Sequence, residues 1–241
     1  MESTPTTPRD ISFRKLMSVA MSARLVWDIA TQMFNPFLPI IAIGLNASVV
    51  EMGRLVSLRS AIGITAPLFG ALADRFGYRL IMQFGLLANA VGLFWVGSSN
   101  SVMGAAPGMV LMGLGMASFL PNMQAYLSAR LPYTRRARGL GMLEYTWALT
   151  GIVGLSLVGL LIANAGWRAP FYLLGAGMAI MALVFRTLPP AGSAPVPLGP
   201  LSGIPPASPI PSSAGAIRRF FDLGPYARSA YTAIAVSSFN F

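Results

Sequence analysis

The 241 residues are rich in apolar side chains and poor in charge: 55% are hydrophobic and only 10% are charged. Soluble domains carry roughly 25% charged residues, so this composition excludes a soluble globular fold and indicates a membrane protein. Cysteine and histidine are absent, which excludes disulfide frameworks, His-based triads and His/Cys zinc sites, and we expect no enzyme, metal or cofactor. The net charge of +10 does not indicate nucleic-acid binding, because the basic residues are spread between apolar stretches.

Six stretches are long enough to cross a bilayer, which takes about 20 mostly apolar residues. We expect these spans at 25–46, 52–73, 79–98, 103–128, 139–163 and 168–187. The sequence therefore predicts an all-α integral membrane protein in four parts. These are a cytoplasmic N-terminal segment at 1–24, a six-helix transmembrane bundle at 25–187, a cytoplasmic Pro-rich linker at 188–225 and the start of a seventh helix at 226–241.

Polar residues recur at helical spacing along the first span. Asp28, Gln32 and Asn35, joined by Thr31, form a stripe on one face. Lipid would not solvate this stripe, so we expect it to face the bundle interior or an aqueous cavity and to form a proton or substrate site. The alternative is purely structural, because Arg24 precedes Asp28 by one turn and could pair with it.

The turn between the second and third spans reads Gly70-Ala-Leu-Ala-Asp74-Arg75-Phe-Gly77-Tyr-Arg79. Gly70 lets helices approach closely, and Gly77 permits a tight turn at positive φ. Asp74 can cap the next helix, while Arg75 and Arg79 hold the loop in the cytoplasm. The alternative is a loop with a topological role only.

Two further charged residues fall inside predicted spans. Arg59 lies in the second span, roughly 10 Å below the outer surface at 1.5 Å per residue, where it faces either a substrate or the outer interface. An Asp28–Arg59 pair would need a deeper or tilted first span, so Asn35 is the nearer partner. Glu144 lies in the fifth span at a depth similar to that of Asp28, and burial of both carboxylates would favour their protonated forms and allow a proton-linked site.

Small residues in the fourth and fifth spans are typical of close helix packing in lipid. The glycines concerned are Gly113, Gly115, Gly151, Gly154 and Gly159.

Basic residues mark alternate connections between the predicted spans and so indicate the cytoplasmic side. They are Arg9, Arg14, Lys15, Arg24, Arg75, Arg79, Arg130, Arg135, Arg136, Arg138, Arg186, Arg218 and Arg219, against Arg54 and Arg168 on the opposite side. The N-terminus is therefore predicted to be cytoplasmic.

The turn at 70–79 resembles the cytoplasmic loop signature of the major facilitator superfamily, G-x-L-a-D-R-x-G-r-R, with Tyr78 in place of a basic residue. Two departures from the family's patterns concern proton coupling. Gly113-Leu-Gly115 fits R-x-x-x-G-x-G, but Met109 stands where the arginine would be. The stretch 154–159 lacks the proline and one glycine of the antiporter signature g-x-x-x-G-P-x-x-G-G.

The resemblance implies a transporter of two six-helix bundles that works by alternating access, with Asp74, Arg75 and Arg79 in a cytoplasmic gate. It identifies this chain as the N-terminal half, truncated early in the seventh span, lying in the plasma or inner membrane and lacking its C-terminal partner half. The stretches 144–149 and 166–171 resemble efflux-type members. We therefore expect proton-coupled export of apolar or amphipathic small molecules. The alternatives are uptake of a small metabolite and a nonfunctional truncated product or membrane scaffold.

Overall fold

The computed structural model describes residues 13–131 and 133–188, with the side chains of 13 and 133–138 left aside. These residues belong to the first of two compact units of the chain, 1–196. Within the described part every regular element is a helix and no strand occurs, as the all-α prediction requires. Most of the predicted linker and the whole predicted seventh helix lie outside the described residues.

The first span is broken, whereas the sequence analysis expected one helix at 25–46. Helix α1 (Phe13–Gln32) begins well before residue 25, and α2 (Phe34–Gly44) continues from it at an angle of 55°. The break has a clear cause, because Pro36 has no N–H to donate to the carbonyl of Gln32 four residues earlier. The bend places the start of α2 inside the bundle, where Phe34 is fully buried.

The remaining helices follow the predicted spans closely. They are α3 (Val49–Ala61), the 3₁₀ turn η1 (Ile62–Thr65), α4 (Ala66–Phe76), α5 (Tyr78–Ser98), α6 (Val102–Arg130), α7 (Tyr133–Leu149), the π-helical turn η2 (Thr150–Gly154), α8 (Leu155–Ala165) and α9 (Ala169–Phe185). Four continuous helical stretches are long and apolar enough to cross a membrane, and the bent pair α1–α2 makes a fifth. Helix α9 is apolar but has only 17 residues, the lower limit for a span.

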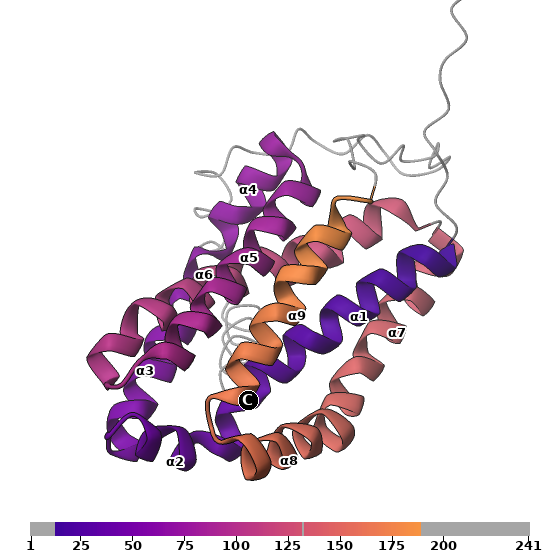
Figure 1. Ribbon diagram of the computed structural model, residues 1–241. Coiled ribbons are helices and arrows are strands. Elements are labelled where there is room, and N and C mark those ends of the chain that lie inside the picture. Colours follow the sequence, from indigo (N-terminus) through magenta and orange to yellow (C-terminus); the bar gives the residue numbers. More distant parts are fainter. Residues whose placement is uncertain (1–12, 132, 189–241) are drawn as a thin grey trace, which may run out of the picture. The chain divides into compact units, whose positions relative to one another are not determined.

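Helices α5 and α6 pack most closely, and glycines make this contact. A β-carbon on Gly92 would lie only 2.7 Å from the carbonyl oxygen of Gly108, and one on Gly108 would lie 2.8 Å from that of Gly92. The two backbones therefore touch, as is usual where helices associate in lipid. In Figure 1, α1 runs between α9 and α7, and this position allows α1 to carry polar groups that meet α7.

Candidate functional site

A buried polar cluster joins α1 to α7. Nε of Arg24 donates to both carboxylate oxygens of Asp28, at 2.8 and 2.9 Å, and the hydroxyl of Thr146 donates to Oδ2 of Asp28 at 2.9 Å. All three residues are at least 95% buried. Asp28 and Arg24 form the one ion pair among the described residues. The Arg24–Asp28 pair that the sequence analysis left as a structural alternative is therefore present.

The Thr146 hydroxyl has two acceptors for one proton. Besides Asp28, it lies 2.6 Å from the carbonyl oxygen of Leu143, one turn earlier in α7. A hydroxyl has a single hydrogen to donate, so protonation of Asp28 would leave Thr146 with a ready alternative acceptor in its own helix. The link between α1 and α7 is thus one that a single proton can weaken.

Other members of the predicted polar stripe lie in different surroundings. The Thr31 hydroxyl donates to the carbonyl of Trp27 within its own helix, and Nε2 of Gln32 is buried without a partner. Asn35 is exposed beyond the bend. Glu144 is also exposed and makes no ion pair within the described residues. The structure therefore brings Asp28 together with Arg24 and Thr146, and it does not bring Asn35 or Glu144 into that cluster.

Arg59 lies in α3 and points at the bend of the first span. Its guanidinium carbon is 4.5 Å from the centre of the Phe34 ring, and the residue is only 5% exposed. Nε and Nη1 are buried and have no hydrogen-bond partner. The 28-residue stretch Val49–Phe76 places Arg59 roughly 15 Å from its first residue at 1.5 Å per residue. Arg59 pairs neither with Asp28 nor with Asn35, the nearer partner in the sequence analysis.

The contact with Phe34 compensates only part of the cost of burying Arg59. A cation over an aromatic ring gains about 2 kcal/mol when it is desolvated, whereas burial of one ion costs several kcal/mol even after relaxation. The remaining cost calls for an acceptor. Among the described residues no carboxylate supplies one.

The Gly-framed turn lies between α4 and α5. Gly77, between the two helices, has φ of +93°, a conformation that residues with a β-carbon rarely adopt. The N-cap of α5 is Gly77 itself, while Asp74 sits in the last turns of α4 and accepts a hydrogen bond of 2.7 Å from the Tyr78 hydroxyl. Tyr78, the departure from the family signature, thus stabilises the turn.

The basic residues of this turn differ in their partners. Nη1 of Arg79 donates to the carbonyl oxygen of Leu188, just beyond α9, at 2.8 Å, so it ties the start of α5 to the end of α9. Arg75 is exposed beside the ring of Phe76. A cavity of about 330 Å³ lies next to the turn and is lined by Ala66, Pro67, Gly70, Asp74, Tyr78, Pro121, Asn122 and Ala125.

Four of the five glycines expected at helix contacts lie against another helix. A β-carbon on Gly113 would lie 2.7 Å from the Arg59 carbonyl oxygen, and one on Gly115 would lie 2.8 Å from that of Gly85. Gly154 faces Ile29 of α1 and Gly159 faces Phe37 of α2, with closest atoms at 2.6 and 3.3 Å. Gly151 is exposed, and a β-carbon there would meet nothing within 4 Å.

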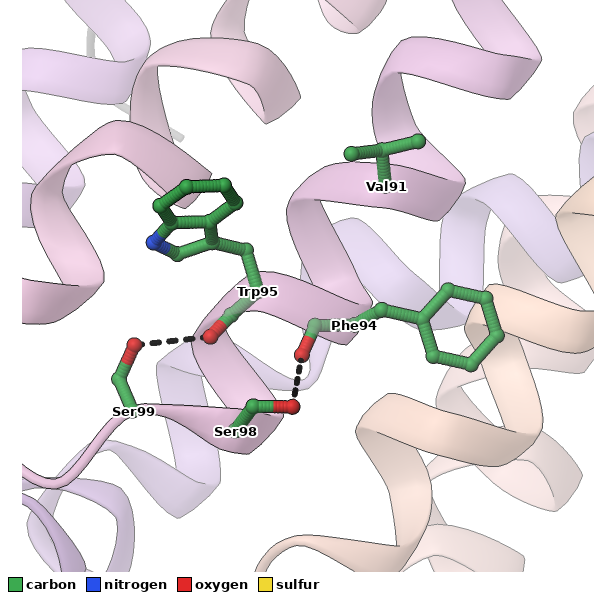
Figure 2. Close-up of a pocket in the computed structure, with 5 residues that line it drawn as sticks. All are labelled: Val91, Phe94, Trp95, Ser98 and Ser99. Atoms are coloured by element: carbon green, nitrogen blue, oxygen red, sulfur yellow. Dashed lines mark hydrogen bonds between the residues drawn. The ribbon is translucent and has the colours of Figure 1, made fainter.

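At the opposite end of α5, a pocket of about 430 Å³ is shaped by apolar rings. Figure 2 shows Phe94 and Trp95 pointing to different sides of α5, with Ser98 and Ser99 donating to the carbonyls four residues earlier. Because both hydroxyl protons are used within the helix, the pocket offers mainly apolar surface. Such aromatic surface is typical of a membrane interface, and we assign the pocket no polar ligand.

The α5–α9 connection at this end depends on the predicted efflux-type stretch. Arg168 donates through Nη2 to the Ser99 carbonyl at 3.1 Å and also to the side chain of Asn100. The Tyr172 hydroxyl donates to the Gly97 carbonyl at 3.1 Å. These bonds satisfy carbonyls that the end of α5 leaves unpaired. Arg168 is therefore a structural residue here.

Two residues of the site were not predicted from the sequence. Thr146 lies in the stretch 144–149, but nothing in its spacing indicated a contact with Asp28, because this contact joins residues 118 apart in sequence. Phe34 gave no polar signal at all. Its role as the wall beneath Arg59 follows only from the bend, for which Pro36 was the available sign.

Comparison with known proteins identifies the family. Residues 20–241 match the sequence profile of the Major Facilitator Superfamily. The uncharacterized transporter YwfA of Bacillus subtilis is 27% identical over 140 residues, covering 58% of this chain and 34% of the relative. The multidrug resistance protein MdtG of Serratia proteamaculans is 25% identical over 187 residues, covering 75% and 45%.

A third relative, from Bacillus subtilis, is named for niacin and nicotinamide transport, NiaP. It is 30% identical over 182 residues, covering 73% of this chain and 44% of the relative. The chain thus spans less than half the length of each of these three relatives. The family profile matches nearly all of this chain, residues 20–241, and the chain therefore belongs to the Major Facilitator Superfamily.

Proposed function

We propose that this chain is the N-terminal half of a proton-coupled exporter of apolar or amphipathic small molecules, and that Asp28 carries the proton. Members of the family are membrane transporters and not enzymes. The observation that carries the proposal is the buried Asp28 carboxylate, which holds Arg24 of its own helix and Thr146 of α7 at once. A carboxylate inside an apolar span is costly to keep, and such residues are functional candidates for that reason.

Protonation of Asp28 supplies the coupling. The neutral acid loses most of its attraction to Arg24, and Thr146 can turn its hydroxyl to Leu143. Helix α1 is then less firmly held to α7. Alternating access needs elements with two arrangements whose balance a ligand or proton can shift, and the α1–α7 contact is such an element in this proposal.

The gate turn has a second role in the proposal. Asp74 and Arg75 lie at the end of α4, and Arg79 lies at the start of α5, on the two sides of Gly77. Arg79 also holds the end of α9 through Leu188. Movement of the turn would therefore move the second, third and sixth spans together. We assign these residues to the cytoplasmic gate, which closes against the C-terminal half of the complete transporter.

Relatives support export without specifying the cargo. Several of them, including MdtG, are named as multidrug resistance proteins. Uptake of a small metabolite is the second candidate, because NiaP is named for niacin and nicotinamide. Since the chain spans less than half of these relatives, transport is assigned to the complete gene product.

Proton-driven transport is the direct test. We expect inside-out vesicles with the complete gene product and an acidic lumen to accumulate ethidium or dansylglycine, measured by fluorescence, because protons leaving the lumen drive the probe inward. Nigericin should release the probe by dissipating the gradient. Vesicles without the protein serve as the control. Failure of both probes to accumulate contradicts export, and gradient-driven movement of labelled nicotinate together with protons would favour the uptake alternative.

Orientation can be tested with single cysteines, because the chain has none of its own. Phe76 is the last residue of α4 and Met103 lies in the first turn of α6, so the two flank opposite ends of α5. The side chains of Met103 and Phe76 are 84% and 56% exposed. In intact cells an impermeant maleimide should label Met103→Cys, and should label Phe76→Cys only after the membrane is opened. The physical reason is that arginines are in excess beside Phe76, which predicts that this end of α5 lies on the cytoplasmic side. The opposite labelling pattern would invert the proposed topology and place the N-terminus outside.

A further inference from the structure

We infer that Arg59 forms an anion site at the bend of the first span, where it receives the carboxylate of an amphipathic substrate. This inference rests on the proposed transport function and adds the charge of the substrate to it. Arg59 reaches the bend from α3, and its guanidinium carbon lies 4.5 Å from the centre of the Phe34 ring. The side chain is buried, and two of its nitrogens have no acceptor.

Unpaired donors accumulate along this span. Nε2 of Gln32 and Nε1 of Trp27 are buried without partners, as are Nε and Nη1 of Arg59. The first turn of α2 begins at Phe34, and its N-cap, Met33, provides no side-chain acceptor. A helix N-terminus carries partial positive charge, and a buried guanidinium points at the same residue. The Gln32 and Trp27 donors are neutral and need only an acceptor, whereas the buried guanidinium of Arg59 calls for an acceptor with negative charge.

The protein's described carboxylates do not meet this need. Asp28 is held by Arg24 and Thr146, and no other ion pair occurs in the part of the chain that the structure describes. The surroundings of Arg59 also fit a particular kind of ligand. Phe34 packs edge-on against Phe171 of α9, with ring centres 5.8 Å apart, so an aromatic wall adjoins the cation. Both rings are buried in the arrangement described here, so an amphipathic anion would place its carboxylate on Arg59 and its apolar body against these rings when alternating access opens the bundle.

Binding of a matched pair of probes tests this inference. Dansylglycine carries a carboxylate, whereas dansylglycinamide is its neutral counterpart. We expect the complete gene product in lipid nanodiscs to bind the carboxylate about tenfold or more tightly than the amide in fluorescence titrations. Arg59→Gln should abolish this preference. Arg59→Lys should keep part of it, because lysine retains the charge but loses the paired donors.

Arg54→Gln is the control, because Arg54 lies exposed on the same helix and should leave the preference unchanged. Thermal unfolding shows whether each variant folds. If Arg59→Gln does not fold, the test rests on Arg59→Lys, which should keep only part of the preference. A preference that survives in Arg59→Gln overturns the inference, as does a wild type that binds both probes equally or neither. Equal weakening of both probes by Arg59→Gln also overturns it and points to an acidic side chain elsewhere in the protein as the partner. Binding is measured without a proton gradient, so failure of proton coupling does not affect this result.

Discussion

Asp28→Asn should abolish pH-gradient-driven transport by the complete gene product and leave exchange of substrate without a gradient intact. Asparagine has the shape of a protonated aspartate but cannot take up or release a proton. The α1–α7 link would therefore stay in the weakened arrangement through the whole cycle. Probe accumulation in vesicles with an acidic lumen, compared with exchange between labelled and unlabelled probe at equal pH, separates coupling from movement.

Folding must be controlled in this experiment, because Asp28→Asn leaves the buried charge of Arg24 without its partner. Removing one member of a buried pair costs about 3–5 kcal/mol. The double variant Arg24→Gln/Asp28→Asn removes both charges, and we expect it to fold better than Asp28→Asn while remaining uncoupled. Glu144→Gln, at an exposed position, should stay coupled. Wild-type pH dependence in Asp28→Asn would make Asp28 a structural residue, and loss of coupling in Glu144→Gln would move the proton site there.

Helix positions were predictable, because a bilayer requires stretches of about 20 mostly apolar residues. Length and apolarity alone placed stretches such as 79–98 within a residue or two of the helix Tyr78–Ser98. The bend of the first span was not predicted, although its cause is local. Pro36 and Pro39 stand only a few residues from the break, but many transmembrane helices contain proline without breaking, so the pattern alone could not decide between a continuous and a bent span.

The polar site was predictable only in part. Asp28 was identified because a carboxylate in an apolar span is costly, and this argument needs no knowledge of its neighbours. Its partner Thr146 depends on how α1 packs against α7, which periodicity does not determine. Arg59 shows the same limit, since depth counting favoured Asn35 as its neighbour. The helix instead turns at Met33, which leaves Asn35 exposed and sets Phe34 beneath the guanidinium.

Gly113→Ala should destabilise the protein by about 1–3 kcal/mol, the usual cost of forcing an extra group into a packed interior. The new methyl group would lie 2.7 Å from the Arg59 carbonyl oxygen and 2.8 Å from Cβ of Ile62. Neither atom can rotate away, because one belongs to the backbone and the other is fixed to it. Helices α3 and α6 would have to move apart at the very residue that carries the proposed anion site. Thermal or denaturant unfolding of the purified protein in one detergent measures the change.

Gly151→Ala is the matched control, since it makes the same substitution in the same membrane domain. Gly151 is exposed with nothing within 4 Å of a β-carbon, so only the helix propensity changes, which favours alanine by up to about 1 kcal/mol. We therefore expect Gly151→Ala to unfold at the wild-type temperature or above, and Gly113→Ala clearly below it. If both variants matched the wild type, α3 and α6 would lie farther apart at Gly113 than the distances above imply. If Gly151→Ala were the more damaged variant, the exposed face of η2 would be a packing surface, as the sequence analysis expected for this glycine.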